Sequence, residues 1–156
     1  MTESARKVEP VTVSSNLWYI SVLCVLGWMI PGSGHLLLKK PKRAVTFFLC
    51  IMILFFWGMN LGAKIWHYER QQPLTFFAMV AQTGVGTPYF VTRAVGTYAQ
   101  NHSEFYFYPF AGRFNFGQGV ISNITFEYGN TFTWVAGLLN FLVILDAFDI
   151  VMKRKE

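Results

Sequence analysis

The chain contains little charge and little cysteine. Asp, Glu, Lys and Arg make up 13% of its 156 residues, which is about half the share found in soluble domains. This composition argues against a water-soluble domain and favours a membrane protein. The two cysteines, Cys24 and Cys50, lie in apolar runs, where a thiol behaves as a small hydrophobe. Their position argues against a structural disulfide and against a cysteine metal site.

Motifs for catalysis are also missing. The sequence contains no phosphate-binding loop, nucleophile motif or metal-ligand spacing, so we predict neither an enzyme nor a resident cofactor. No helical spacing or acidic cluster links His35, His67 and His102, and His35 is the one weak candidate for binding a pigment or haem. The formal charge of +5 comes from cations that flank apolar runs, which favours anionic lipid headgroups as partners and not nucleic acid.

Long apolar runs are what the chain has instead. Residues 44–66 stay uncharged for about 20 residues, until Lys64, which predicts a membrane-crossing helix. A run at about 17–38 and another at 131–152 are also long enough. We therefore predict an all-α membrane protein, a single domain over 1–156 with three transmembrane helices, and four as the alternative.

Cations gather beside two of these runs, in the turn at 39–43 and at the C-terminus: Lys39, Lys40, Lys42, Arg43, Lys153, Arg154 and Lys155. Because cytoplasmic loops carry the excess of Lys and Arg, both clusters are expected inside. With three spans, the N-terminus and residues 67–129 then lie outside. Four spans with one basic cluster outside is the alternative. The predicted location is the bacterial cytoplasmic (inner) membrane, with a multi-pass topology.

The segment at 73–96 predicts an amphipathic helix. Its polar and small residues are separated by seven, four and seven positions and share one face: Thr75, Gln82, Gly86 and Arg93. Such a helix lies in the membrane interface or packs as a span with its polar face inward. Gly84, Gly86 and Pro88 predict a kink or break halfway.

Residues 97–129 are rich in aromatic side chains and favour an extended loop or hairpin on the outer side. Seven Phe and Tyr residues crowd into its middle: Phe105, Tyr106, Phe107, Tyr108, Phe110, Phe114 and Phe116. They can form a small core, cover the membrane interface or contact a partner protein.

Two carboxylates near the end of the last run are the main candidates for chemistry. Asp146 and Asp149 are three residues apart and share roughly one helix face, and Asn140 lies nearby. We predict an ion-pair network at the membrane edge that includes Asp146, Asp149, Lys39, Lys40, Lys42, Arg43 and Lys153. Because carboxylates at membrane depth are costly and often functional, proton or ion transport through Asp146, Asp149 and Asn140 is an alternative.

Two glycine patterns carry structural predictions. In "PGSGH", Pro31, Gly32 and Gly34 end the first run and reverse the chain, which brings His35 within reach of Asp146 if both ends meet. Gly58 and Gly62 form a G-x-x-x-G pair, a spacing that lets two helix backbones approach closely.

Four blocks carry a family resemblance: "PGSGHLLLKKPKRAVTFF", "QPLTFFAMVAQTGVGTPYFVTRAVG", "FEYGNTF" and "VAGLLNFLVILDAFDIV". Together they resemble an uncharacterised, largely acidobacterial family of small membrane proteins with a P-G-x-G-H turn, loosely related to two-transmembrane (TM-two type) domains. The resemblance covers about residues 16–152. Leu37 and Lys39 stand where that family has an aromatic residue and a glycine, which predicts a looser turn. The resemblance implies location and architecture and supplies no catalytic residues.

The expected function is that of a non-enzymatic structural or accessory subunit of a larger membrane complex, whose partners are other membrane proteins. The aromatic loop and the helix faces would make its contacts. A small ion or proton transport element, and a pigment- or haem-binding subunit using His35, are the alternatives.

Overall fold

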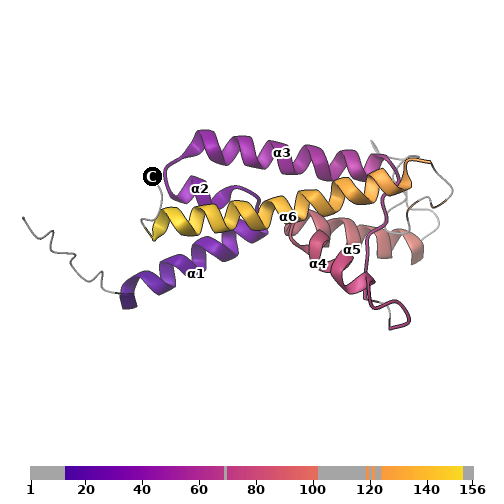
Figure 1. Ribbon diagram of the computed structural model, residues 1–156, viewed down its shortest axis with the longest axis horizontal. Helices are drawn as coiled ribbons and strands as arrows, with labels where there is room; N and C mark the ends of the chain where they lie inside the picture. Colours follow the sequence, from indigo (N-terminus) through magenta and orange to yellow (C-terminus); the bar gives the residue numbers. More distant parts are fainter. Residues whose placement is uncertain (1–12, 69, 102–118, 120, 122–123, 153–156) are drawn as a thin grey trace, which may run out of the picture.

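The computed structural model describes residues 13–68, 70–101, 119, 121 and 124–152, and their regular structure is entirely helical (Figure 1). They form six helices: α1 Val13–Met29, α2 Ser33–Leu37, α3 Pro41–Asn60, α4 Thr75–Thr83, α5 Thr87–Asn101 and α6 Phe126–Val151. The predicted all-α class is confirmed for this part of the chain.

The frame of the molecule is the antiparallel pair α3 and α6. With 20 and 26 residues they are about 30 and 39 Å long, and both are long and apolar enough to cross a membrane. The predicted apolar helices at 44–66 and 131–152 are therefore present with shifted ends. The proline at the first position of α3 suits a helix start, and Gly62, with φ of +90°, lies in the turn after its end.

The two long helices touch most closely where α3 ends. A Cβ atom on Gly58 would lie 2.7 Å from the carbonyl oxygen of Gly129 and 2.8 Å from the Thr133 side chain. Gly58 thus lets the two backbones approach. Gly62 is not on the same helix face as Gly58, because α3 has already ended at Asn60, and the second helix supplies Gly129 instead.

The first apolar run is a helical hairpin and not one helix. Pro31 has no N–H to continue α1, and Gly32 takes a left-handed conformation with φ of +79°. A Cβ there would lie 2.5 Å from the carbonyl oxygen of Ala44, so glycine is needed for the reversal. After it, α2 runs back beside α1, with Gly34 against Leu23.

The prediction of a single membrane-crossing helix over 17–38 is therefore wrong. The apolar part of α1, Leu17–Met29, is too short to count as a spanning helix. The start of α1, the turn at 39–40 and the end of α6 all lie at one end of the molecule (Figure 1). The start of α1 therefore lies at the same end of the molecule as the basic turn, because the chain turns back halfway, whereas the predicted topology puts the N-terminus and this turn on opposite sides of the membrane.

Helices α4 and α5 form a second hairpin at the opposite end of the molecule from the first. The break lies at Gly84–Gly86, where Gly86 has φ of +80°, so the predicted interruption of segment 73–96 is present. α4 and α5 diverge from this break towards the end where α3 stops and α6 begins (Figure 1). α5 continues to Asn101 and so takes in the first five residues of the predicted loop 97–129. Most of that loop, including the aromatic residues from Phe105 to Phe116, lies outside the described residues, as does Lys153.

The fold thus repeats one pattern in opposite directions. A hairpin with a glycine pair at its tip precedes a long helix, first as α1–α2 before α3 and then as α4–α5 before α6. The tips contain Gly32 and Gly34 in the first unit and Gly84 and Gly86 in the second. Both hairpins pack on α6, one on each half of its length.

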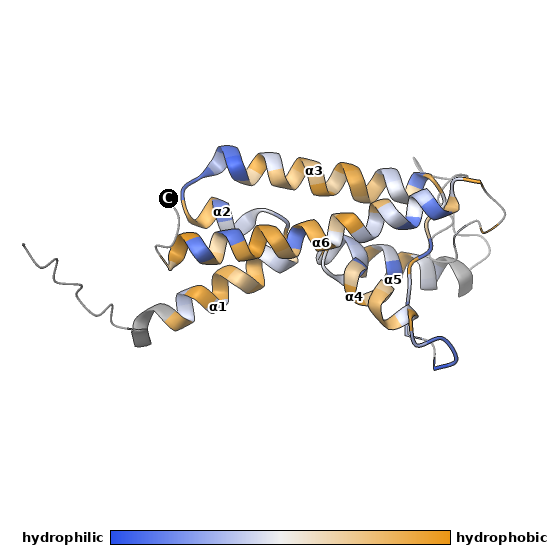
Figure 2. Ribbon diagram, viewed as in Figure 1, coloured by the Kyte–Doolittle hydropathy of each residue, from blue (hydrophilic) through white to orange (hydrophobic). Residues whose placement is uncertain are grey.

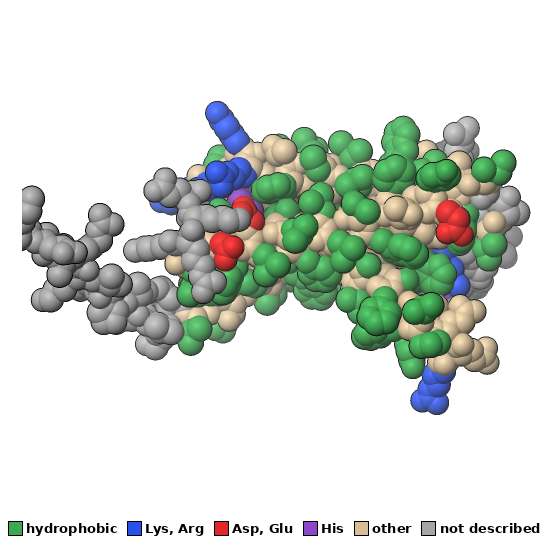
Figure 3. Space-filling model, in the orientation of Figure 1, with side chains coloured by type: hydrophobic (Ala, Val, Ile, Leu, Met, Phe, Trp, Pro, Cys, Tyr) green, Lys and Arg blue, Asp and Glu red, His purple; other side chains and the backbone are tan. Residues whose placement is uncertain are grey.

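Apolar side chains cover the outside as well as the core. The core includes Ile51 and Phe55 of α3, Val85 and Tyr89 at the second tip, and Val143 of α6. Outward-facing leucines such as Leu138, Leu142 and Leu145 of α6 are each more than half exposed. Figure 2 shows hydrophobic residues along the helices, and Figure 3 shows charged side chains gathered towards the two ends with apolar ones between. This is the surface pattern expected of a protein that sits in a lipid bilayer.

Candidate functional site

The two hairpin tips meet against the middle of α6, at Asn140. This side chain is fully buried, and its Nδ2 donates hydrogen bonds to the carbonyl oxygens of Gly27 (3.2 Å) and Gly84 (2.9 Å). Trp28 Nε1 donates to the carbonyl of Thr83 at 2.9 Å, across the same contact. The Gly27 and Gly84 carbonyls lie at the ends of α1 and α4, where helix geometry leaves carbonyl groups without partners inside the helix, whereas the Thr83 carbonyl also accepts from the Gly86 N–H at 3.0 Å. One amide thus ties both hairpins to α6.

Glycine makes this junction possible. A Cβ atom on Gly86 would collide with the carbonyl oxygen of Trp28, and one on Gly137 would collide with that of Ala81. A Cβ atom on Gly84 would also be too close to the carbonyl oxygen of Gly137. Backbone therefore packs directly on backbone where the first hairpin, the second hairpin and α6 converge.

The Asn140→Leu substitution tests the tie. Leucine has similar bulk but no donor, so the Gly27 and Gly84 carbonyls would stay buried and unpaired. We expect a loss of about 2 kcal/mol or more in the free energy of unfolding, measured by SDS titration in mixed micelles. Asn60→Leu, the same change at the exposed last residue of α3, should shift it by no more than about 0.5 kcal/mol. Equal effects of the two changes would contradict this role of Asn140.

A second polar cluster holds the non-helical chain that follows α3. Gln82 of α4 is fully buried and accepts from the Trp66 N–H (2.8 Å) through Oε1. Its Nε2 donates to the Lys64 carbonyl (2.8 Å) and to Thr133 Oγ1 (2.9 Å). Asn130 Oδ1 accepts from the Lys64 N–H at 2.9 Å. The Gln82 amide thus accepts from one backbone N–H and donates to one backbone carbonyl of the segment at 64–66, as a neighbouring β-strand does in a sheet.

Two hydroxyl groups complete this cluster. Tyr89 of α5 donates to the Trp66 carbonyl at 2.8 Å, and Thr125 donates to the Leu61 carbonyl at 2.9 Å. The Lys64 ammonium lies 4.8 Å from the centre of the Trp66 ring, a cation–π contact. Non-helical backbone is tolerated in an apolar interior where side chains satisfy its N–H and C=O groups. The cluster is a structural device for that purpose.

The third polar feature is the pair of His35 and Asp146. His35 is fully buried in α2, and its Nε2 lies 3.1 Å from Asp146 Oδ2 of α6, a side chain that is 28% exposed. The contact that the sequence places between the opening turn and the last helix is therefore present. Phe47 of α3 lies against the imidazole, with ring centres 5.1 Å apart. Among the described residues, His35 Nδ1 has no hydrogen-bond partner.

The remaining members of the predicted ion-pair network differ in position. Lys39 and Lys40 lie in the turn before α3, and Lys42 and Arg43 lie in the first turn of α3. Within the described part of the chain no ion pair joins these four side chains to a carboxylate. Asp149 lies one turn beyond Asp146 on α6. The pair that links the first hairpin to α6 is thus a histidine and a carboxylate, and the Lys and Arg side chains of the turn are mostly exposed.

A double-mutant cycle measures how much the contact between His35 and Asp146 contributes to the free energy of unfolding. We expect His35→Gln and Asp146→Asn each to destabilise the protein, and the double variant to be less destabilised than the sum. The expected coupling energy in the free energy of unfolding is about 1 to 2 kcal/mol, because one partner is buried and the other half-buried. A coupling near zero would show that the contact contributes no stability.

Sequence reasoning missed the junction and half of the second cluster. The sequence pattern places Gln82 on a polar face, but it does not single out Asn130 and Thr133, and it includes Asn140 only in the alternative of ion or proton transport. A signal was available: Asn130, Thr133, Gly137 and Asn140 repeat at three, four and three residues in an otherwise apolar run, which places them on one face of α6. That face is where both hairpins and the end of α3 pack.

Comparison with known proteins gives one result. No curated protein and no solved structure matches the chain. A family defined as one of unknown function, DUF6677, matches residues 22–156, from the middle of α1 to the last residue. The match takes in most of the first hairpin, the whole of the second and both long helices, so the chain belongs to the family of unknown function DUF6677.

Proposed function

We propose that this protein is a multi-pass integral protein of the bacterial cytoplasmic membrane, and that it serves as a non-enzymatic structural or accessory subunit of a larger membrane assembly. Two helices of spanning length and an apolar outer surface support the membrane location. The family match supports membership of an uncharacterised group and carries no activity.

The proposed topology replaces three spans with two. α3 and α6 cross the bilayer, and the two hairpins enter it from opposite sides and return to the side they came from. The basic turn at 39–43 and the cations at 153–155 then both lie in the cytoplasm, as the distribution of Lys and Arg favours. The N-terminal segment joins them there, because α1 starts at the same end. Residues 102–123 lie outside.

The hairpin junction is the observation that carries a structural role. The Asn140 Nδ2 donates to backbone carbonyls of this chain, and Gly86 and Gly137 lie directly against backbone atoms of neighbouring elements. Such an interior supports a rigid body that holds its shape in lipid. The outward faces of α3 and α6 carry large apolar side chains, including Ile53, Trp57 and Leu142, which suit contact with lipid or with another membrane helix.

Photo-crosslinking in the native membrane tests the subunit role. A photoreactive residue at Leu142 or Ile53, which are 62% and 61% exposed, should form adducts with one defined membrane polypeptide. The same residue at Leu23, which is fully buried, should form none and serves as the control. Adducts with lipid alone, together with a monomer in mild detergent, would argue against the proposal.

A proton-transfer role is the second candidate, and the His35–Asp146 pair favours it. A buried imidazole beside a half-exposed carboxylate can exchange a proton with the membrane edge. Vesicles that hold the purified protein and a pH-sensitive dye should then show a proton flux that Asp146→Asn abolishes. A flux equal to that of protein-free vesicles would remove this candidate, and a colourless purified sample would remove pigment or haem binding by His35.

A further inference from the structure

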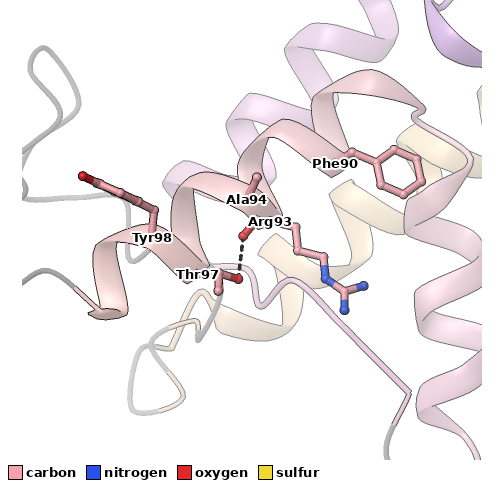
Figure 4. Close-up of a pocket in the computed structure, with 5 residues that line it drawn as sticks. All are labelled: Phe90, Arg93, Ala94, Thr97 and Tyr98. Carbon is pink, nitrogen blue, oxygen red and sulfur yellow. Dashed lines mark hydrogen bonds between the residues drawn. The ribbon is translucent and has the colours of Figure 1, made fainter.

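A groove lies on the outer face of α5. It has a volume of about 490 Å³ and is lined by Phe90, Arg93, Ala94, Thr97 and Tyr98. In Figure 4, the Arg93 and Tyr98 side chains point away from each other, with the small residues Ala94 and Thr97 between them. The Thr97 hydroxyl donates to the Arg93 carbonyl at 3.1 Å, so this donor is already used within α5.

Arg93 is the charged group in this groove. Its Nη1 lies 3.4 Å from the Tyr89 hydroxyl oxygen, which itself donates to the Trp66 carbonyl. A guanidinium has five N–H donors, so this one long contact leaves most of them available. Within the described residues no carboxylate pairs with Arg93, and α5 contains no acidic side chain.

The position of Arg93 along α5 makes an unpaired cation costly. α5 starts at the hairpin junction, in the middle of the molecule, and Arg93 lies six residues further, about 9 Å along the helix axis. Phe90, which is exposed, lies about one turn before it on the same face. A guanidinium at such a depth reaches towards the headgroup layer and attracts an anion.

We propose that this groove binds one anionic phospholipid. The phosphate pairs with the Arg93 guanidinium, whose planar donors match two phosphate oxygens, and an acyl chain lies along Phe90 and Ala94 towards the hairpin junction. Tyr98, one turn nearer to the end of the molecule, stands at the level where aromatic rings meet the headgroups. This inference rests on the proposed membrane location.

Native mass spectrometry tests the lipid site. The full chain, purified in mild detergent with equal amounts of phosphatidylglycerol and phosphatidylcholine, should retain one phosphatidylglycerol per protomer with a preference of about tenfold or more. Arg93→Gln should abolish the preference, and Arg93→Lys should keep part of it. Arg70→Gln removes an exposed cation outside the groove and should leave the preference unchanged.

Equal retention of the two lipids by the unaltered protein would overturn the lipid site, even if Arg93→Gln failed to fold. An unchanged preference in Arg93→Gln, or an equal loss in Arg70→Gln, would overturn it too. Failure of the membrane location has a separate sign: alkaline carbonate would then release the protein from membranes. A protein that resists carbonate but shows no lipid preference keeps the membrane location and loses the lipid site.

Discussion

Replacing Gly86 by alanine should abolish the folded state or cost at least about 3 kcal/mol in the free energy of unfolding. Two causes add up. The φ of +80° strains any residue with a Cβ, and that Cβ would collide with the carbonyl oxygen of Trp28 and lie 2.9 Å from that of Met29. Since these atoms are backbone of the last turn of α1, they move only if the two hairpins separate. SDS titration in mixed micelles, followed by circular dichroism, measures the loss.

Gly27→Ala is the matched control. Gly27 lies in α1 at the same junction, but a Cβ there would meet the Ile144 side chain at 3.4 Å, an ordinary contact. Alanine also favours a helix by about 1 kcal/mol over glycine. We expect the free energy of unfolding to stay within about 1 kcal/mol of that of the unaltered protein or to rise. Equal destabilisation by both changes would show that crowding at the junction is general and that the tip of the second hairpin has no special role.

Replacing Gln82 by leucine should have the second largest effect, about 3 kcal/mol or more. The change removes three hydrogen bonds at once: the one from the Trp66 N–H, the one to the Lys64 carbonyl and the one to the Thr133 hydroxyl, which keeps its bond to the Asn130 carbonyl. Each unpaired buried group costs about 1 to 3 kcal/mol. Since the segment at 64–66 is not helical, its backbone groups have no nearby replacement. The same SDS titration measures the change.

Gln71→Leu makes the identical chemical change at an exposed position outside the cluster, and it should alter the free energy of unfolding by no more than about 0.5 kcal/mol. The fluorescence of Trp66 gives a second readout, because the backbone N–H of this residue donates to Gln82. Its fluorescence should shift in Gln82→Leu, measured in a background without the other tryptophans, and stay constant in Gln71→Leu. A stable Gln82→Leu variant with unchanged fluorescence would show that the cluster does not hold this segment.

The two long helices could be predicted from the sequence, and the first hairpin could not. α3 and α6 have uninterrupted apolar runs, and length alone identifies such helices. The run at 17–38 is also apolar, but hydropathy does not show whether such a run continues as one helix or turns back on itself. The reversal depends on the φ of Gly32 and on its contact with Ala44, which lies twelve residues further along the chain. Gly84, Gly86 and Pro88 revealed the second break because they interrupt a visibly amphipathic pattern.

The candidate site divides in the same way. The pairing of His35 with Asp146 follows from charge, since a carboxylate and an imidazole at one end of an apolar protein tend to meet. The role of Asn140 leaves no comparable signature, because its partners are the carbonyls of Gly27 and Gly84, and any residue has a carbonyl. A polar residue in an apolar helix suggested transport, whereas the structure shows its amide bound to the ends of two other helices.

The inverted pattern explains why both hairpins are needed. Each is too short to reach across the length of α6, and each covers the half that the other leaves bare. Their tips then share Asn140, so the loss of one hairpin would expose unpaired carbonyls of the other. Paired broken helices of this kind meet near the middle of a bilayer in several transport proteins. Here backbone atoms pack against Gly86 and Gly137 where the two hairpins meet, and this close packing agrees with a structural role.

Cysteine labelling of intact cells tests the two-hairpin topology most directly. Single cysteines at Ser4, Ser103 and Glu156, in a background where Cys24 and Cys50 are replaced by alanine, would be treated with a membrane-impermeant maleimide. We predict that position 103 reacts in intact cells and that positions 4 and 156 react only after the membrane is opened. Labelling of position 4 in intact cells, with position 156 still protected, would mean that residues 17–38 cross the membrane and would contradict the hairpin.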